Sequence, residues 1–273
     1  MLRSKEKQGW WLVTHPDHAH LAGEFASKWG NELFAAPEPR ENVLRGIYAH
    51  DDGWRARDAA PVITKEGKPA AFSKELVGKY SAFEEIDLTA YLAVRREAVQ
   101  LMAKEDPYAA ILISMHTHNL LSERADRSTI RAEGLVWLDA FLVEQMTLQR
   151  ALREQLVDES RLDEEQLTPR TLHRHFQLLQ ACDNLSLLGC VDFEGEATLL
   201  HLFTTKSGET TEIAVKRVGA RSFRLSPYPF AEPNLKFTFP ARYVEGERFR
   251  SSEELREKLE VAERVEIEVS ITS

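Results

Sequence analysis

Residues 169–191 read PRTLHRHFQLLQACDNLSLLGCV. Pro169 stands where proline favours the first turn of a helix. Apolar residues then return every three or four positions, which predicts a helix with one buried face. That face carries Leu172, Phe176, Leu179, Asp183, Ser186, Leu187 and Cys190. Asp183 therefore occupies the middle of a helical face that we expect to lie in the core.

The chain before this helix is predicted to be helical as well. A first helix begins near Thr14 or His15, has Pro16 in its first turn and extends to Trp29. It follows residues 8–14, which are expected to form a short strand or an extended segment. A second helix begins after a proline-containing loop, and Gly53 is expected to end it. Further helical periodicity covers residues 84–104, 108–121 and 131–156.

After Phe193 the sequence changes to short β-branched and aromatic runs separated by glycine and proline. One helix, opened by Ser251, interrupts these runs. We therefore expect a mainly α protein with a small C-terminal antiparallel β or α+β portion. The expected division is a helical domain at residues 1–192 and a small β-rich portion, packed on it, at residues 193–273.

The bulk composition narrows the classes of partner. The 273 residues include 44 Asp and Glu against 35 Lys and Arg, which gives a formal net charge of -9. This charge argues against nucleic acid and anionic lipid as partners. No apolar run reaches the length of a signal-peptide core or a membrane span. We expect a cytoplasmic protein with a small-molecule substrate or ligand and no nucleic-acid or membrane partner, and homo-oligomerisation stays open.

The two earlier helices also carry polar residues on their apolar faces, namely His18 and the adjacent pair His50 and Asp51. A lone histidine on such a face is more often a hydrogen-bonded core residue than a metal ligand. A buried carboxylate changes the balance, because an ionised Asp without a partner is strongly destabilising. No Lys or Arg lies on the Asp183 face within one turn.

Two histidines and two aspartates that point into one core offer imidazole and carboxylate ligands. Such ligands suit Mn, Fe, Ni or Zn and lack the thiolates of structural zinc sites. The sequence therefore predicts a divalent transition metal, of unspecified identity, bound by His18, His50, Asp51 and Asp183.

Five further histidines are weighed against this site. His116 and His118 are two residues apart and project about 200° apart on a helix, so at most one faces the site, and we favour His116. His15 precedes His18 by three residues and is a candidate to support it. Surface or helix-capping roles are expected for His173 and His175.

The spacing of these residues resembles that of the HD-domain superfamily. His18 lies on one helix, the adjacent pair His50 and Asp51 follows the next, and the distant Asp183 completes the set. The resemblance implies a helical bundle of the HD-domain type, a divalent metal on those four side chains and hydrolysis of a phosphate ester.

Longer motifs are similar to an uncharacterised bacterial family, the domain-of-unknown-function 3891 family. The similarity runs through almost the whole chain. The motifs that carry it are PDHA at 16–19 with LAG at 21–23, HDDGW at 50–54, SMH at 114–116, CDNLSL at 182–187 and PYPF at 227–230.

A metal-dependent phosphohydrolase is the function that this resemblance favours. In such an enzyme Asp51 would bridge a second metal, His116 would be a ligand of that second metal or an acid for the leaving group, and Asp52 would be a weaker candidate base. One departure weakens the phosphate-ester inference, because many HD hydrolases have a lysine where this chain has Trp54. Two arginines, Arg124 and Arg127, are candidates to supply the missing charge.

Two other functions use the same ligands. The first is a non-catalytic protein that binds a metal or senses a small molecule, in a pocket lined by tryptophans. The second is iron-dependent oxygen chemistry. The tryptophans in question are Trp10, Trp11, Trp29 and Trp54, although aromatic residues at helical spacing, such as Trp29 and Trp54, are more often core residues.

Overall fold

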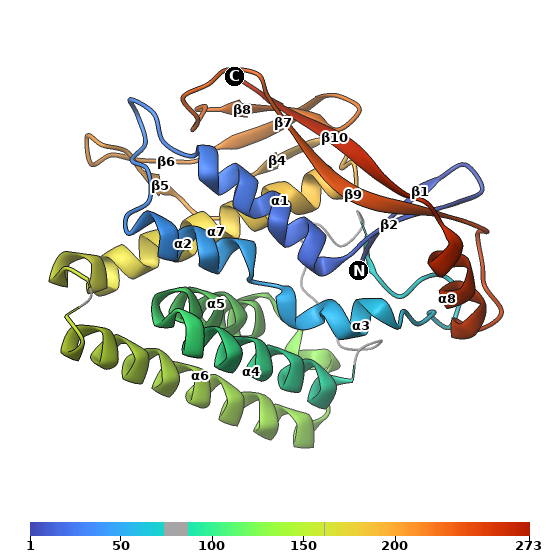
Figure 1. Cartoon of the computed structure of the whole chain (residues 1–273), viewed down its shortest axis with the longest axis horizontal. Helices are drawn as coiled ribbons and strands as arrows, with labels where there is room; N and C mark the ends of the chain where they lie inside the picture. The colour runs from blue at the N-terminus through green and yellow to red at the C-terminus, as the bar shows by residue number, and fades with distance from the viewer. Residues whose placement is uncertain (74–86, 161) are drawn as a thin grey trace.

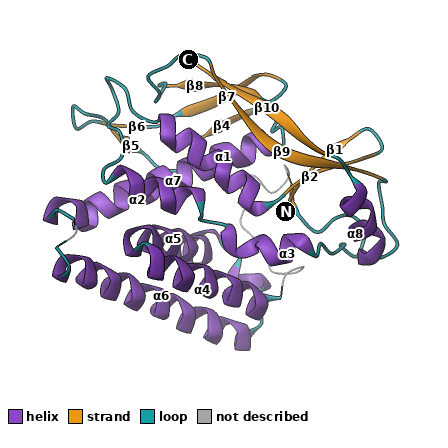
Figure 2. Cartoon of the chain, in the orientation of Figure 1, coloured by secondary structure: helices purple, strands orange, loops and turns teal. Residues whose placement is uncertain are grey.

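The computed structural model of the chain describes residues 1–73, 87–160 and 162–273. A large sheet crosses one side of the molecule, and most of the helices lie beneath it (Figures 1 and 2). The helices are α1 His15–Lys28, α2 Arg40–Tyr48, α3 Arg55–Ala59, α4 Leu88–Glu105, α5 Pro107–Asn119, α6 Ala132–Asp158, α7 Pro169–Cys190 and α8 Ser252–Val261. The strands are β1 Leu2–Glu6, β2 Gly9–Val13, β3 Phe72–Ser73, β4 Glu196–Thr198, β5 Phe203–Thr204, β6 Thr210–Thr211, β7 Ala214–Gly219, β8 Ser222–Ser226, β9 Leu235–Glu245 and β10 Arg264–Thr272.

The sheet joins both ends of the described chain. Its eight strands follow the order β3-β1-β2-β9-β10-β8-β7-β4, so β2 lies between β1 and β9, with Trp10 opposite Val244. The expectation of a mainly α, HD-type helical bundle with a small C-terminal β portion is therefore wrong. The segment that forms β2 is predicted as a short strand or an extended segment, but its pairing with a strand more than 200 residues away leaves no local signal in the sequence.

The predicted division into a domain at residues 1–192 and a portion at residues 193–273 stays a prediction.

In the part of the chain that the structure describes, no helix combines the length and the apolar character that crossing a membrane requires.

Helices α1 and α7 lie between the sheet and other helices, and they contact both (Figure 1). The ring of Phe25 on α1 meets the ring of Phe237 on β9 edge to face, with 4.8 Å between centroids. Helix α5 lies further from the sheet, in contact with α2, α4, α6 and α7. The first eight residues of α5 are all buried, which explains why they are nearly all apolar.

Helix α4 packs closely against the turn that follows α2. Helix α2 ends at Tyr48, so His50 and Asp51 lie in this turn and not on the helix that was predicted to continue to Gly53. A Cβ atom at Gly53 would lie 2.8 Å from the Cβ of Ala98 on α4, closer than two side chains can pack. Glycine at this position therefore lets α4 lie directly against the His-Asp turn.

Candidate metal centre

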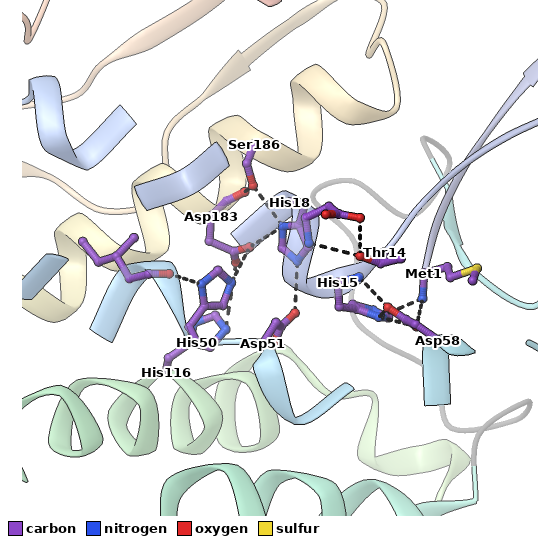
Figure 3. Close-up of polar contacts among 12 residues, drawn as sticks. Met1, Thr14, His15, His18, His50, Asp51, Asp58, His116, Asp183 and Ser186 are labelled. Atoms are coloured by element: carbon purple, nitrogen blue, oxygen red, sulfur yellow. Dashed lines mark hydrogen bonds and ion pairs between the residues drawn. The ribbon is translucent and has the colours of Figure 1, made fainter. Parts of the chain in front are cut away.

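Five of the predicted site residues converge in the interior from four parts of the chain (Figure 3). His18 comes from α1, His50 and Asp51 from the turn after α2, His116 from α5 and Asp183 from α7. All five are buried. The apolar faces of the three helices pack together, and the polar residues on those faces therefore meet.

Asp183 lies at the centre of three imidazole rings. Its Oδ1 atom is 3.3 Å from His50 Nε2 and 3.7 Å from His18 Nδ1, and its Oδ2 atom is 4.0 Å from His116 Nε2. Within the described ranges no Lys or Arg forms an ion pair with Asp183. A buried carboxylate that faces several imidazoles and no fixed cation is a suitable ligand for a divalent ion.

Two imidazole nitrogens in this cluster have no hydrogen-bond partner among the described residues, namely His50 Nε2 and His116 Nδ1. His50 Nδ1 lies 2.7 Å from the carbonyl oxygen of Ile47, and it must donate a hydrogen because the carbonyl can only accept. A neutral His50 then carries its lone pair on Nε2, directed into the cluster. This pattern, in which one ring nitrogen donates to a carbonyl and the other faces inward, is typical of metal-binding histidines.

The charges in the cluster are coupled. Burial alone would lower the pKa of His50, but the negative charges of Asp51 and Asp183 raise it above its usual value. Burial alone would raise the pKa of Asp183, and the neighbouring His50 holds it below its usual value. Burial lowers the pKa of His116 to about 3. A protonated His50 beside an ionised Asp183 is therefore the metal-free alternative to a bound cation.

Asp51 differs from Asp183 because it has a fixed cation. Arg95 on α4 is 5% exposed and donates from Nη1 to Asp51 Oδ1. Its guanidinium group also lies 5.3 Å from the ring centroids of Trp54 and Tyr91. Burial would raise the pKa of Asp51, but the charge of Arg95 holds it well below its usual value. Sequence reasoning missed Arg95, although it lies on one helical face with Tyr91 and Val99.

His18 is held from both sides. Its Nε2 atom lies 3.0 Å from Asp51 Oδ2, and its Nδ1 atom lies 3.0 Å from Ser186 Oγ. The same Ser186 Oγ donates to the carbonyl oxygen of Asp183 at 2.8 Å. Ser186 thus links the orientation of the His18 ring to helix α7.

The ligand atoms form two groups that share His50. One atom from each of His18, His50 and Asp51 lies within 4.8 Å of the others, and the same holds for His50, His116 and Asp183. The second group has a carboxylate without a fixed cation, the unpaired Nε2 atom of His50 and the Nε2 atom of His116. Its donor set therefore fits a divalent transition metal better than the first group does.

Other predicted residues lie outside the cluster. Asp52 is exposed and forms an ion pair with Arg55 at 2.8 Å. Arg127 forms an ion pair with Asp139 on α6, and Arg124 lies in the irregular turn that follows α5. Neither arginine has a contact with the cluster in the portion of the chain that the structure describes.

The four tryptophans do not gather around one pocket. Trp10 packs with Val244 and Phe249, and Trp11 lies against Tyr243. Trp29 contacts Phe34, Phe203 and Phe230. Trp54 stacks on His15, with 4.8 Å between centroids. The expectation that these side chains line a common site is therefore wrong, and three of them are buried core residues.

His15 and His118 flank the cluster without joining it. The ring of His15 lies 6.0 Å from that of His18, and its Nδ1 atom is 3.0 Å from Asp58 Oδ1. Burial lowers the pKa of His15 to about 4. His118 lies near Ser122 on the far side of α5, so His116 is the member of its pair that faces the cluster.

His175 is a buried core residue, which contradicts its expected surface or capping role. Its Nδ1 atom lies 2.7 Å from the hydroxyl of Tyr108. Burial, reinforced by the charge of Arg174, lowers its pKa from 6.5 to about 4. The folded chain therefore keeps this imidazole neutral at a pH where the unfolded chain would protonate it.

This difference predicts a loss of stability in acid. Because the pKa of His175 is lower in the folded chain, the unfolded chain binds more protons between pH 6.5 and 4, and the free energy of unfolding falls as pH falls through this window. From pH 7 to pH 5 we expect the wild type to lose about 2 kcal/mol more than the His175→Gln variant. Urea unfolding at several pH values measures this, and parallel pH profiles would contradict it.

Comparison with known proteins places the chain in a family. A family model described as "Protein of unknown function (DUF3891)" matches residues 1–246. The chain belongs to the DUF3891 family. No curated protein and no solved structure matches it. The resemblance to the HD-domain superfamily gains no support from these comparisons or from the fold.

Proposed function

We propose that this DUF3891 protein binds a divalent transition metal through His50, His116 and Asp183, with His18 and Asp51 beside them, and uses it to hydrolyse a phosphate ester. The observation that carries the proposal is the environment of Asp183. This buried carboxylate faces three imidazoles and, among the described residues, no Lys or Arg. A divalent ion beside Asp183 would satisfy both the carboxylate and the unpaired Nε2 atom of His50.

Each side chain has a defined part in this proposal. His50 is oriented by its hydrogen bond to Ile47, and His18 by Asp51 and Ser186. Arg95 holds Asp51 ionised, so Asp51 keeps accepting from His18. A bound ion would lower the pKa of a coordinated water toward neutrality and polarise a phosphoryl oxygen. Asp52 is not part of this arrangement, because it is exposed and paired with Arg55.

A non-catalytic metal-binding protein is the second candidate. The observation that favours it is the burial of the ligands, since His18, His50 and His116 are at most 1% exposed. In addition, Arg95 is the cation nearest the cluster among the described residues. Because it is already paired with Asp51, it is not free to bind a substrate phosphate.

Turnover of generic substrates separates the two candidates. We expect metal-loaded wild type to hydrolyse para-nitrophenyl phosphate or bis-para-nitrophenyl phosphate, and the His50→Gln variant to be at least about 100-fold slower, as expected when a group acting in the transition state is removed. His50→Gln keeps a polar side chain but removes the imidazole. Equal turnover by the two proteins would mean a contaminating phosphatase. No turnover by protein shown to hold metal would exclude hydrolysis of these two ester classes and leave the binding protein.

A further inference from the structure

Helix α6 has two apolar faces, and only one of them is covered. Its inner face, with Leu138, Phe141, Leu152 and Leu156, is buried against the other helices. Its outer face lies at the edge of the molecule (Figure 1). The large apolar side chains there are Val136, Val143 and Met146, which are 67%, 64% and 58% exposed, with Trp137 at its flank 55% exposed. Apolar side chains gathered at this level of exposure mark an interaction surface.

The exposed apolar residues of the outer face share one seven-residue repeat. Counted in steps of four and three from Ala132, the repeat contains Val136, Val143, Met146 and Val157, and its other positions are the charged residues Asp139, Arg150 and Arg153. This seven-residue alternation keeps one seam along the helix, which suits packing against a second helix. The same seam places a negative charge on one side of its apolar centre and a positive charge on the other.

The charges specify an antiparallel pairing with an identical helix. A two-fold axis midway between residues 143 and 146 puts Val143 of one copy opposite Met146 of the other. Asp139 and Arg150 are equally far from that axis, so Asp139 of each copy faces Arg150 of its partner. Within one chain Asp139 also forms an ion pair with Arg127. The Asp139 side chain is nevertheless 60% exposed, so it remains accessible to a second copy.

We propose that α6 is the interface of a homodimer, in which two copies of the helix pack antiparallel around Val143 and Met146. The two symmetric Asp139–Arg150 contacts fix its register. This proposal is independent of the metal centre, because residues of the α6 outer face make no contact with the cluster in the described structure.

Sedimentation of the full chain tests the interface. The wild type is expected to have about twice the 31.2 kDa mass of one chain and to dissociate on dilution. Asp139→Arg or Arg150→Asp alone places like charges opposite each other twice in each dimer, and each should raise the dissociation constant at least about tenfold. The double variant, Asp139→Arg with Arg150→Asp, recreates opposite charges and should bring the constant back to within about threefold of wild type.

Glu212→Arg is the matched control. It makes the same change in charge as Asp139→Arg, at an exposed position near the sheet and away from α6. It should leave the dissociation constant unchanged. A wild type that stays monomeric at the highest concentration would overturn the proposal. A dimer that neither single reversal weakens, or that the double reversal fails to restore, would overturn this interface.

Discussion

Replacing Arg95 by Met is expected to lower the free energy of unfolding by roughly 3 to 5 kcal/mol, the cost of leaving one partner of a buried ion pair alone. Met has a similar length and fills the space between Trp54 and Tyr91, so the loss reports mainly on charge. Arg95 and Asp51 are 5% and 6% exposed, and without the guanidinium group Asp51 must either protonate or stay charged without its cation. Urea unfolding in the presence of a chelator measures the change.

The next residue of the same helix supplies the control. Arg96 pairs with Glu144 at 2.8 Å, but both side chains are more than a third exposed, so Arg96→Met should cost only about 0 to 1 kcal/mol. Adding Asp51→Asn to Arg95→Met should recover part of the loss, because it removes the stranded charge. An Arg95→Met variant as stable as Arg96→Met would show that the pair does not hold this part of the core.

Replacing Asp183 by Asn is expected to lower the affinity for a divalent transition metal by more than about 100-fold, which exceeds the usual effect of losing only an outer partner of a ligand. In the wild type, free metal at about 100 times its dissociation constant stabilises the fold by about 2.7 kcal/mol. For a chain of this size that corresponds to a melting temperature higher by roughly 5 to 10 °C. The variant should show almost none of this shift, because Asn keeps the shape but removes the charge.

Asp106→Asn is the control for this measurement. Asp106 is also buried, but it caps the N-terminus of α5 and has no contact with the cluster in the described structure. Asn is an equally good cap, so the metal response should match that of the wild type. If Asp183 is merely the partner of His50, the metal-induced shift should instead be the same in wild type and Asp183→Asn.

The sequence predicted which residues form the cluster but not Arg95, the cation that pairs with Asp51. His18, His116 and Asp183 were recognisable because each interrupts an apolar helical face, and such faces must meet in a common core. Arg95 gives the same signal with Tyr91 and Val99, but an arginine in a helix is so often exposed that this pattern does not by itself predict burial. Asp51 was therefore assigned to a metal without its cation.

The sheet was less predictable for a physical reason. Strand β2 is short, and its apolar run matched an extended segment before α1 as well as a strand. Its pairing with β9 depends on contacts between residues such as Trp10 and Val244, which are far apart in the sequence. Periodicity reports which face of an element is buried, but it does not say which distant element covers that face.

The metal content of the wild-type chain, purified without chelator and then reconstituted in turn with Mn, Fe, Ni and Zn, tests the central claim most directly. Elemental analysis after removal of free metal should find about one divalent ion per chain for at least one of these metals, since a folded chain with buried orphaned ligands binds the ion that satisfies them. Values far below one for every metal, from protein that remains folded, would contradict the metal centre and leave His50 and Asp183 as a buried ion pair.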